Sequence, residues 1–152
     1  MSDIRIRKAT LDDLAAVVDL SVNGNVSASR NAGSALPEHY LAAFEAISAD
    51  ANNELIVAEM NDEIVGTLQL TFIPGLSYEG GVRVHVEGVV VSSKHRNRGI
   101  GTQLMKHVIS DARQRGCCLV QLMAPKWRSE VHRFYQKLGF SLTHEGAKLE
   151  LQ

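Results

Sequence analysis

Two apolar runs separated by a tight-turn pair constrain the fold of this chain more than any other feature. Residues 54–60 and 63–73 both have the pattern of β-strands, and Asn61-Asp62 between them suits a two-residue hairpin turn. Strands joined by so short a turn are antiparallel neighbours in one sheet. The first half of the chain is therefore not made of repeated strand–helix–strand units, which separates it from the common nucleotide-binding folds.

The periodicity of the remaining segments predicts the other elements. Val82, Val84 and Val86 share one face of a strand over 82–91, whose other face carries Arg83, His85 and Glu87, and Gly88 predicts a bulge. We further expect a strand over 4–7, helices from Thr10 and Pro37 around a loop over 21–36, a helix over 99–114, a strand over 118–123, a helix over 129–137 and terminal strand material after Gly139. This order predicts one α/β domain over residues 1–152, with a mixed sheet flanked by helices on both faces.

Composition excludes several function classes. Sixteen basic and seventeen acidic residues leave a formal net charge of −1, so no overall field attracts nucleic acid or an anionic membrane. No apolar run approaches the roughly 20 residues that span a bilayer, and no signal peptide is evident at Met1, so we expect a cytoplasmic protein. Cys117 and Cys118 are adjacent, which predicts two reduced thiols, and the Cys and His spacing offers no metal site.

The stretch from Val89 to Thr102 carries the clearest chemical signal. An apolar strand passes through a basic turn containing Gly99 and Gly101 into a helix. Small residues let phosphate oxygens approach the main chain, the first helical N–H groups are unpaired, and the helix dipole attracts anions. Arg96 and Arg98 add donors for charge-assisted hydrogen bonds. The spacing is Arg-x-x-Gly-x-Gly, which is neither a phosphate-binding loop ending in Gly-Lys-Ser/Thr nor a Gly-x-Gly-x-x-Gly motif.

This spacing resembles the fingerprint of the GNAT family of N-acetyltransferases, Gln/Arg-x-x-Gly-x-Gly/Ala between the fourth strand and the third helix. A second marker of that family resembles the helix that carries Tyr135 and ends at Leu138-Gly139-Phe140. The segment Val86 to Val91, with its acidic residue and bulge, is similar to the family's fourth strand. The element order extends this resemblance over nearly the whole chain.

The resemblance implies acetyl-CoA as co-substrate. Main-chain groups of the fourth strand would pair with the pantetheine amides, an N–H near Val89 would hold the thioester oxygen, and the turn would hold the pyrophosphate. The cofactor-binding residues expected on this basis are Val89, Val90, Val91, Arg96, Asn97, Arg98, Gly99, Ile100, Gly101 and Thr102. One departure is visible, because Arg128 stands where the family often has an asparagine that contacts pantetheine.

Two residues are the candidates for proton transfer. The hydroxyl of Tyr135 suits the general acid that protonates the departing thiolate, the alternative being core packing beside Phe134 and Phe140. Glu87 suits the general base, the alternative being a strand residue paired with Arg83. His85, His132 or water are the other bases open to test.

The acceptor is the least constrained part of the prediction. We expect the primary amine of a small molecule, with a protein N-terminus or lysine as the rival acceptor and a non-catalytic acyl-CoA-binding regulator as the rival function. Arg30, Tyr78 and Glu79 lie in the two loops where acceptor recognition is expected, or are plain surface, whereas Trp127 and Met123 are expected to pack. Unpaired edge strands make a homodimer a further expectation.

Overall fold

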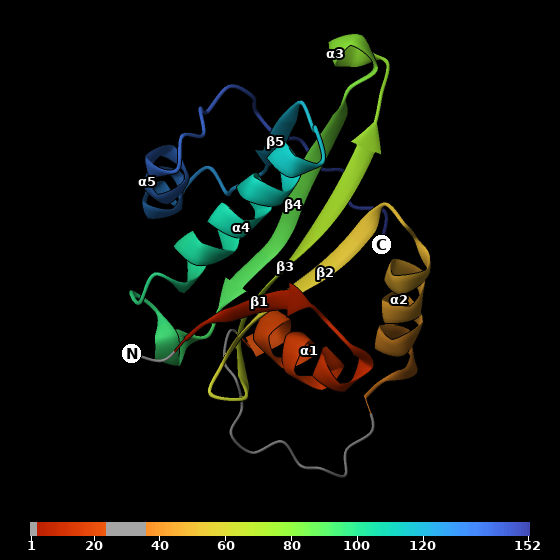
Figure 1. The fold of residues 1–152 in the computed structure, drawn as a ribbon, viewed down its shortest axis with the longest axis vertical. Coiled ribbons are helices and arrows are strands. Elements are labelled where there is room, and N and C mark those ends of the chain that lie inside the picture. The colour runs from red at the N-terminus through yellow and green to blue at the C-terminus, as the bar shows by residue number, and fades with distance from the viewer. Residues whose placement is uncertain (1–2, 24–35) are drawn as a thin grey trace.

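A five-stranded sheet forms the centre of the computed structural model, which describes residues 3–23 and 36–152 (Figure 1). The strand order is β1-β2-β3-β4-β5; the first four strands are antiparallel to their neighbours, and β5 runs parallel to β4. The strands are β1 (Arg5–Lys8), β2 (Asn53–Met60), β3 (Glu63–Pro74), β4 (Val82–Val91) and β5 (Leu119–Leu122). The mixed sheet expected from the sequence is confirmed.

Helices cover both faces of this sheet. On one face, Ala16, Val17 and Leu20 pack against Val57 and Ile64, and on the other, residues of two later helices join Leu68, Leu70 and Phe72 in the main core. The short 3₁₀ turn Leu11–Asp13 leads into α1 (Leu14–Asn23), and the helices that follow are α2 (Glu38–Ala49), α3 (Ser77–Gly80), α4 (Ile100–Gln114) and α5 (Ser129–Lys137). We call the side covered by α4 and α5 the α4 face, and the side covered by α1 the α1 face.

The two turns that the sequence singled out have the expected backbone. Asn61 and Asp62 have φ angles of 52° and 61°, the left-handed pair that a tight hairpin needs. In β4, pairing with β3 steps from Glu87–Gln69 to Val90–Thr67, so two residues of β4 lie opposite one residue of β3. Gly88, at φ 63°, is one of those two, and the predicted bulge is confirmed.

A network of ion pairs fixes the far end of α4 on the sheet. The buried carboxylate of Glu54 accepts a hydrogen bond from Arg115 at 2.7 Å and lies 3.2 Å from the ammonium of Lys8. The guanidinium of Arg115 also stacks on the ring of Phe72, 4.4 Å from its centroid. Because the buried carboxylate is paired twice, this end of α4 is held in one position against β2 and β3.

The prediction for the end of the chain is wrong. Residues 140–152 form neither helix nor strand, and every residue from 141 to 152 is exposed. A strand needs a partner for its main-chain groups, and the terminal segment does not pair with the outer edge of β5, which is paired with β4 alone among the described strands.

None of the helices within residues 3–23 and 36–152 is long and apolar enough to cross a membrane.

Candidate functional site

The edge of β4 next to β5 becomes free halfway along the strand. Parallel pairing between them covers Arg83–Leu119 to Val86–Leu122 and then ends, while β4 runs on to Val91 (Figure 1). Main-chain N–H and C=O groups on that side of β4, beyond Val86, therefore have no strand partner. An extended ligand that carries amide groups can pair with such an edge in the way another strand would.

The turn that follows β4 presents unpaired donors. Asn97 and Gly99 have φ angles of 61° and 78°, and α4 begins directly after Gly99. No side chain caps the helix, so the N–H groups of Ile100, Gly101 and Thr102 have no intrahelical acceptor. These groups and the positive end of the helix dipole point at one place.

The surroundings of this turn fit an anionic ligand. A Cβ built on Gly99 meets nothing within 4 Å, so the space beside its main chain is open. Arg96 and Arg98 are exposed, and neither pairs with a carboxylate in the described residues. Open space, free N–H donors and two unpaired guanidiniums are what a pyrophosphate group requires.

Gly101 has a packing role that the sequence did not reveal. A Cβ at this position would lie 3.3 Å from Cζ of Phe134 and 3.8 Å from Cγ2 of Val91. Glycine therefore lets α5 approach the first turn of α4, in addition to any approach that it allows a ligand. The motif glycines thus differ, because Gly99 needs its left-handed φ and Gly101 needs its lack of a side chain.

Two enclosed polar atoms in the same turn were missed. Oγ of Ser92 and Nδ1 of His95 are buried and have no hydrogen-bond partner among the described residues. The main chain holds both residues in place, because Ser92 N–H donates to Val65 and His95 N–H donates to Ser92. No sequence signal pointed to them, since burial of a serine or a histidine is decided by the fold.

Tyr135 is buried with its hydroxyl at an opening. The residue is 7% exposed, and its ring makes edge contacts with Phe134 and Phe140 at centroid distances of 5.0 and 5.6 Å. Its hydroxyl has no partner in the described residues, yet it is not one of the fully enclosed unpaired atoms, so it reaches space that water can enter. Burial raises the pKa of Tyr135, an effect that the charge of Arg128 partly opposes. A raised pKa keeps the proton on the hydroxyl.

Glu87 lies on the opposite face of the sheet. Its side chain is exposed, shares the α1 face with Gln69 and makes no ion pair within the described ranges, so the pairing with Arg83 considered above is not found. Tyr135 packs in the core of the α4 face. The two residues therefore lie on opposite faces of the sheet, which separates a group that could take a proton from one that could give it.

The other candidates from the sequence have mixed outcomes. Nε2 of His132 lies 2.8 Å from the carbonyl oxygen of Pro125. Arg128 directly precedes α5, and its Nε donates to Glu130 at 3.2 Å. Packing was the wrong expectation for Trp127 and Met123, which are 83% and 59% exposed because their loop projects beyond the end of β5. Tyr78 and Glu79 are exposed in α3, and Arg30 falls outside the described residues.

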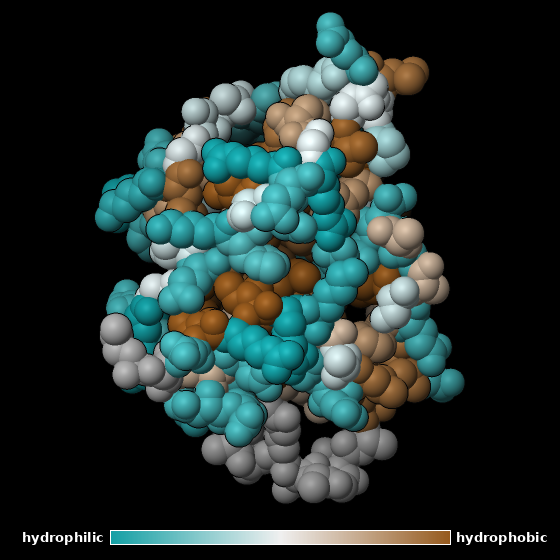
Figure 2. All heavy atoms as spheres, viewed as in Figure 1, coloured by the Kyte–Doolittle hydropathy of each residue, from teal (hydrophilic) through white to brown (hydrophobic). Residues whose placement is uncertain are grey.

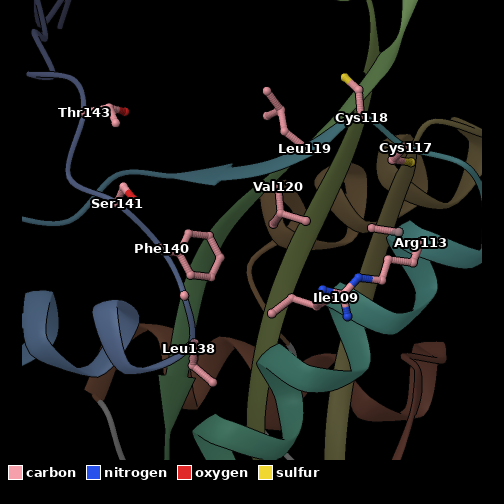
Figure 3. Close-up of a pocket in the computed structure, with 12 residues that line it drawn as sticks. Ile109, Arg113, Cys117, Cys118, Leu119, Val120, Leu138, Phe140, Ser141 and Thr143 are labelled. Atoms are coloured by element: carbon pink, nitrogen blue, oxygen red, sulfur yellow. The ribbon is translucent and has the colours of Figure 1, made fainter.

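A pocket elsewhere does not belong to this site. An open pocket of about 430 Å³ lies between the C-terminal half of α4, β5 and the segment after α5, and Figure 3 shows the residues that line it. Cys117, Cys118 and Arg113 line it, whereas the free donors lie at the other end of α4. Burial raises the pKa of Cys117, which opposes formation of a reactive thiolate there.

Comparisons with known proteins identify a family and similar structures. The family model described as the acetyltransferase (GNAT) family matches residues 25–140. A crystal structure from Bacillus halodurans, described as a transcriptional regulator, has a TM-score of 0.85 at 43% identity and covers 98% of this chain and 100% of that one.

Two curated relatives are similar over shorter segments. Aminoalkylphosphonate N-acetyltransferase of Salmonella typhimurium is 31% identical over 101 residues, which are 66% of this chain and 65% of that protein. Glucosamine 6-phosphate N-acetyltransferase of Trypanosoma brucei brucei is 32% identical over 88 residues, 58% of each protein. The matched segments thus span less than two thirds of the length of either relative.

Proposed function

The chain belongs to the acetyltransferase (GNAT) family, and from that membership we propose that it transfers the acetyl group of acetyl-CoA to the primary amine of a small molecule. The observation that carries the proposal is the uncapped start of α4 beside the free edge of β4. The first offers donors to a pyrophosphate, and the second offers main-chain groups to a pantetheine arm. A domain over residues 1–152 and a cytoplasmic location remain predictions.

Most of the predicted site residues have a direct role in this proposal. Arg96, Arg98 and the N–H groups of Ile100 to Thr102 hold the pyrophosphate, while the main chain of Val89 to Val91 orients the pantetheine and the thioester oxygen. Acetyl-CoA supplies the activated acetyl group. Glu87 takes the proton that the amine loses as its nitrogen bonds to the acetyl carbon, and Tyr135 gives a proton to the sulfur as the carbon–sulfur bond breaks.

The activities named for the two curated relatives support a small acceptor. Their names describe enzymes that acetylate an aminoalkylphosphonate and glucosamine 6-phosphate, both of which are small amines. A protein N-terminus or lysine remains the rival acceptor. The Bacillus halodurans structure is described as a transcriptional regulator. A second candidate function is therefore a regulator, for which we propose binding of acyl-CoA without turnover.

Calorimetry and product analysis together test the proposal. We expect acetyl-CoA to bind and to raise the melting temperature of the protein, because a ligand that binds only the folded state stabilises it. Incubation with amines, amino acids, aminoglycosides, polyamines and peptides should yield one acetylated class by mass spectrometry. Absence of acetyl-CoA binding contradicts the proposal, and binding without any acetylated product favours the regulator.

Replacement of Glu87 by glutamine should lower turnover about tenfold near neutral pH and less in alkaline buffer. An amine with a pKa near ~10 is mostly protonated at pH 7, so the missing base matters most there. Rising pH supplies free amine and restores part of the rate. The rate of product formation against pH, measured beside His85→Gln, decides between the two bases. An unchanged pH profile for Glu87→Gln with ordinary turnover would make Glu87 a structural residue.

A homodimer is part of the same proposal and has its own check. The outer edge of β5 has no partner among the described strands, and Leu142, Leu149 and Leu151 of the terminal segment are 58%, 85% and 89% exposed. An unpaired strand edge and exposed apolar side chains each favour self-association. Light scattering during size-exclusion chromatography should give twice the 16.6 kDa chain mass.

A further inference from the structure

A row of polar side chains crosses the α1 face at the level of the first residue of β2. Asn53, Thr71, His85 and Gln121 occupy matching register positions on four neighbouring strands, and all four are half-buried. Oγ1 of Thr71 donates to Oδ1 of Asn53 at 3.0 Å, and Nε2 of Gln121 lies 3.5 Å from Nδ1 of His85. We call these four residues the polar row.

The polar row lies beyond the part of the sheet that α1 covers. The α1 cluster includes Val57, Ile64 and Val90, which lie further along the sheet than the row. Glu87 is the next residue of β4 on this face after His85, between the polar row and the α1 cluster. A half-buried polar surface of this kind is suited to hold a polar molecule against the proposed base.

Arg83 borders the polar row on the side away from Glu87. Its neighbours in register are Ile73 and Leu119, both apolar. Its guanidinium lies against the loop after β3, because a Cβ at Gly75 would be only 3.2 Å from Nη1. Arg83, the polar row and Glu87 therefore follow one another on a single face of the sheet.

Arg83 has no anionic partner among the described residues, in contrast to Arg7 on β1. Of the arginines in the described ranges, only Arg7 and Arg83 are half-buried. Arg7 is paired with Asp13 at 2.6 Å and with Glu59 at 3.2 Å, whereas no carboxylate among the described residues pairs with Arg83. A guanidinium without a counter-ion keeps its donors available for charge-assisted hydrogen bonds to an anion.

From this arrangement we propose that Arg83 selects acceptor amines that carry an anionic group, a carboxylate or a phosphonate-type oxyanion. The inference rests on the proposed function, because it places the amine beside Glu87. Glu87 is four positions after Arg83 on an extended strand, which puts roughly 13 Å between their Cα atoms. The polar row lies between them and offers amide and imidazole groups to hydroxyls of the same molecule. A dicationic acceptor would bring its second charge toward Arg83 and is disfavoured.

Four acceptors of similar length test this selection: 3-aminopropylphosphonate, 4-aminobutyrate, 4-aminobutanol and 1,4-diaminobutane. We expect kcat/KM for the better anionic acceptor to exceed that for 4-aminobutanol by about tenfold or more, mainly through KM, because the bond to Arg83 exists before and during the reaction. Comparison of 3-aminopropylphosphonate with 4-aminobutyrate shows which oxyanion is preferred. Calorimetry with the anionic acceptor and no acetyl-CoA measures its binding separately.

Variants at Arg83 make the test specific. Arg83→Gln should remove the preference for the anion and leave the neutral acceptor and acetyl-CoA affinity unchanged, and Arg83→Glu should favour 1,4-diaminobutane. Arg113→Gln, which removes an exposed guanidinium at the far end of α4, should match the unaltered protein.

Two outcomes overturn the inference without touching the proposed function. One is equal use of anionic and neutral acceptors, and the other is an anion preference that survives in Arg83→Gln. A third outcome, acetyl-CoA binding without acetylation of any of the four amines, also overturns the inference about Arg83. Failure of acetyl-CoA to bind at all contradicts the proposed function itself.

Discussion

Tyr135→Phe is expected to lower turnover by about 100-fold or more while the fold and the affinity for acetyl-CoA stay unchanged. The variant removes only a hydroxyl that has no partner in the described residues. The ring contacts with Phe134 and Phe140 remain available to phenylalanine, so the core around α5 keeps its packing. Because burial raises the pKa of Tyr135, the hydroxyl keeps its proton throughout the neutral range and can donate it.

Steady-state turnover, with calorimetry for acetyl-CoA affinity, measures this effect. Tyr40→Phe is the matched control, because it removes a tyrosine hydroxyl from α2, away from the α5 core. We expect that variant to keep ordinary turnover. If Tyr135→Phe stays within a factor of two of the unaltered protein, Tyr135 is a packing residue and another group or water protonates the sulfur.

Gly101→Glu is expected to weaken acetyl-CoA binding by about 100-fold or more. Gly101 lies in the first turn of α4, where three N–H groups have no intrahelical acceptor. A carboxylate there is attracted to those same donors and to the positive end of the helix dipole. It would therefore occupy the groups that the pyrophosphate needs and add a like charge beside the phosphates.

The contact with Phe134 requires a control for this variant. Gly101→Ala adds the Cβ that lies 3.3 Å from the Phe134 ring but adds no charge. Calorimetry on both variants, with circular dichroism to confirm folding, separates packing from electrostatics. We expect alanine to have the smaller effect on affinity. If the folded Gly101→Glu protein binds acetyl-CoA with unchanged affinity, the pyrophosphate does not bind at this turn.

Local patterns predicted most of the elements. The hairpin at Asn61-Asp62, the bulge at Gly88 and the α5 helix from Ser129 to Lys137 all follow from turn chemistry and side-chain period, which neighbouring residues decide among themselves. The turn before α4 was predictable for the same reason, since its glycines and arginines act within one short segment. The terminal strand was not, because pairing depends on a partner far away in the sequence.

The sequence by itself predicted the order of the elements along the chain, the basic glycine-containing turn before α4 and the candidate pair Glu87 and Tyr135, because each is marked by residues close together in the chain. Only the tertiary structure decided that this pair lies on opposite faces, that Gly101 accommodates Phe134 and that Arg83 has no counter-ion. These properties depend on which distant segments meet. The burial of a side chain, and the presence or absence of an interaction partner for it, are set when the sheet and its helices pack together. A local sequence pattern therefore does not predict them.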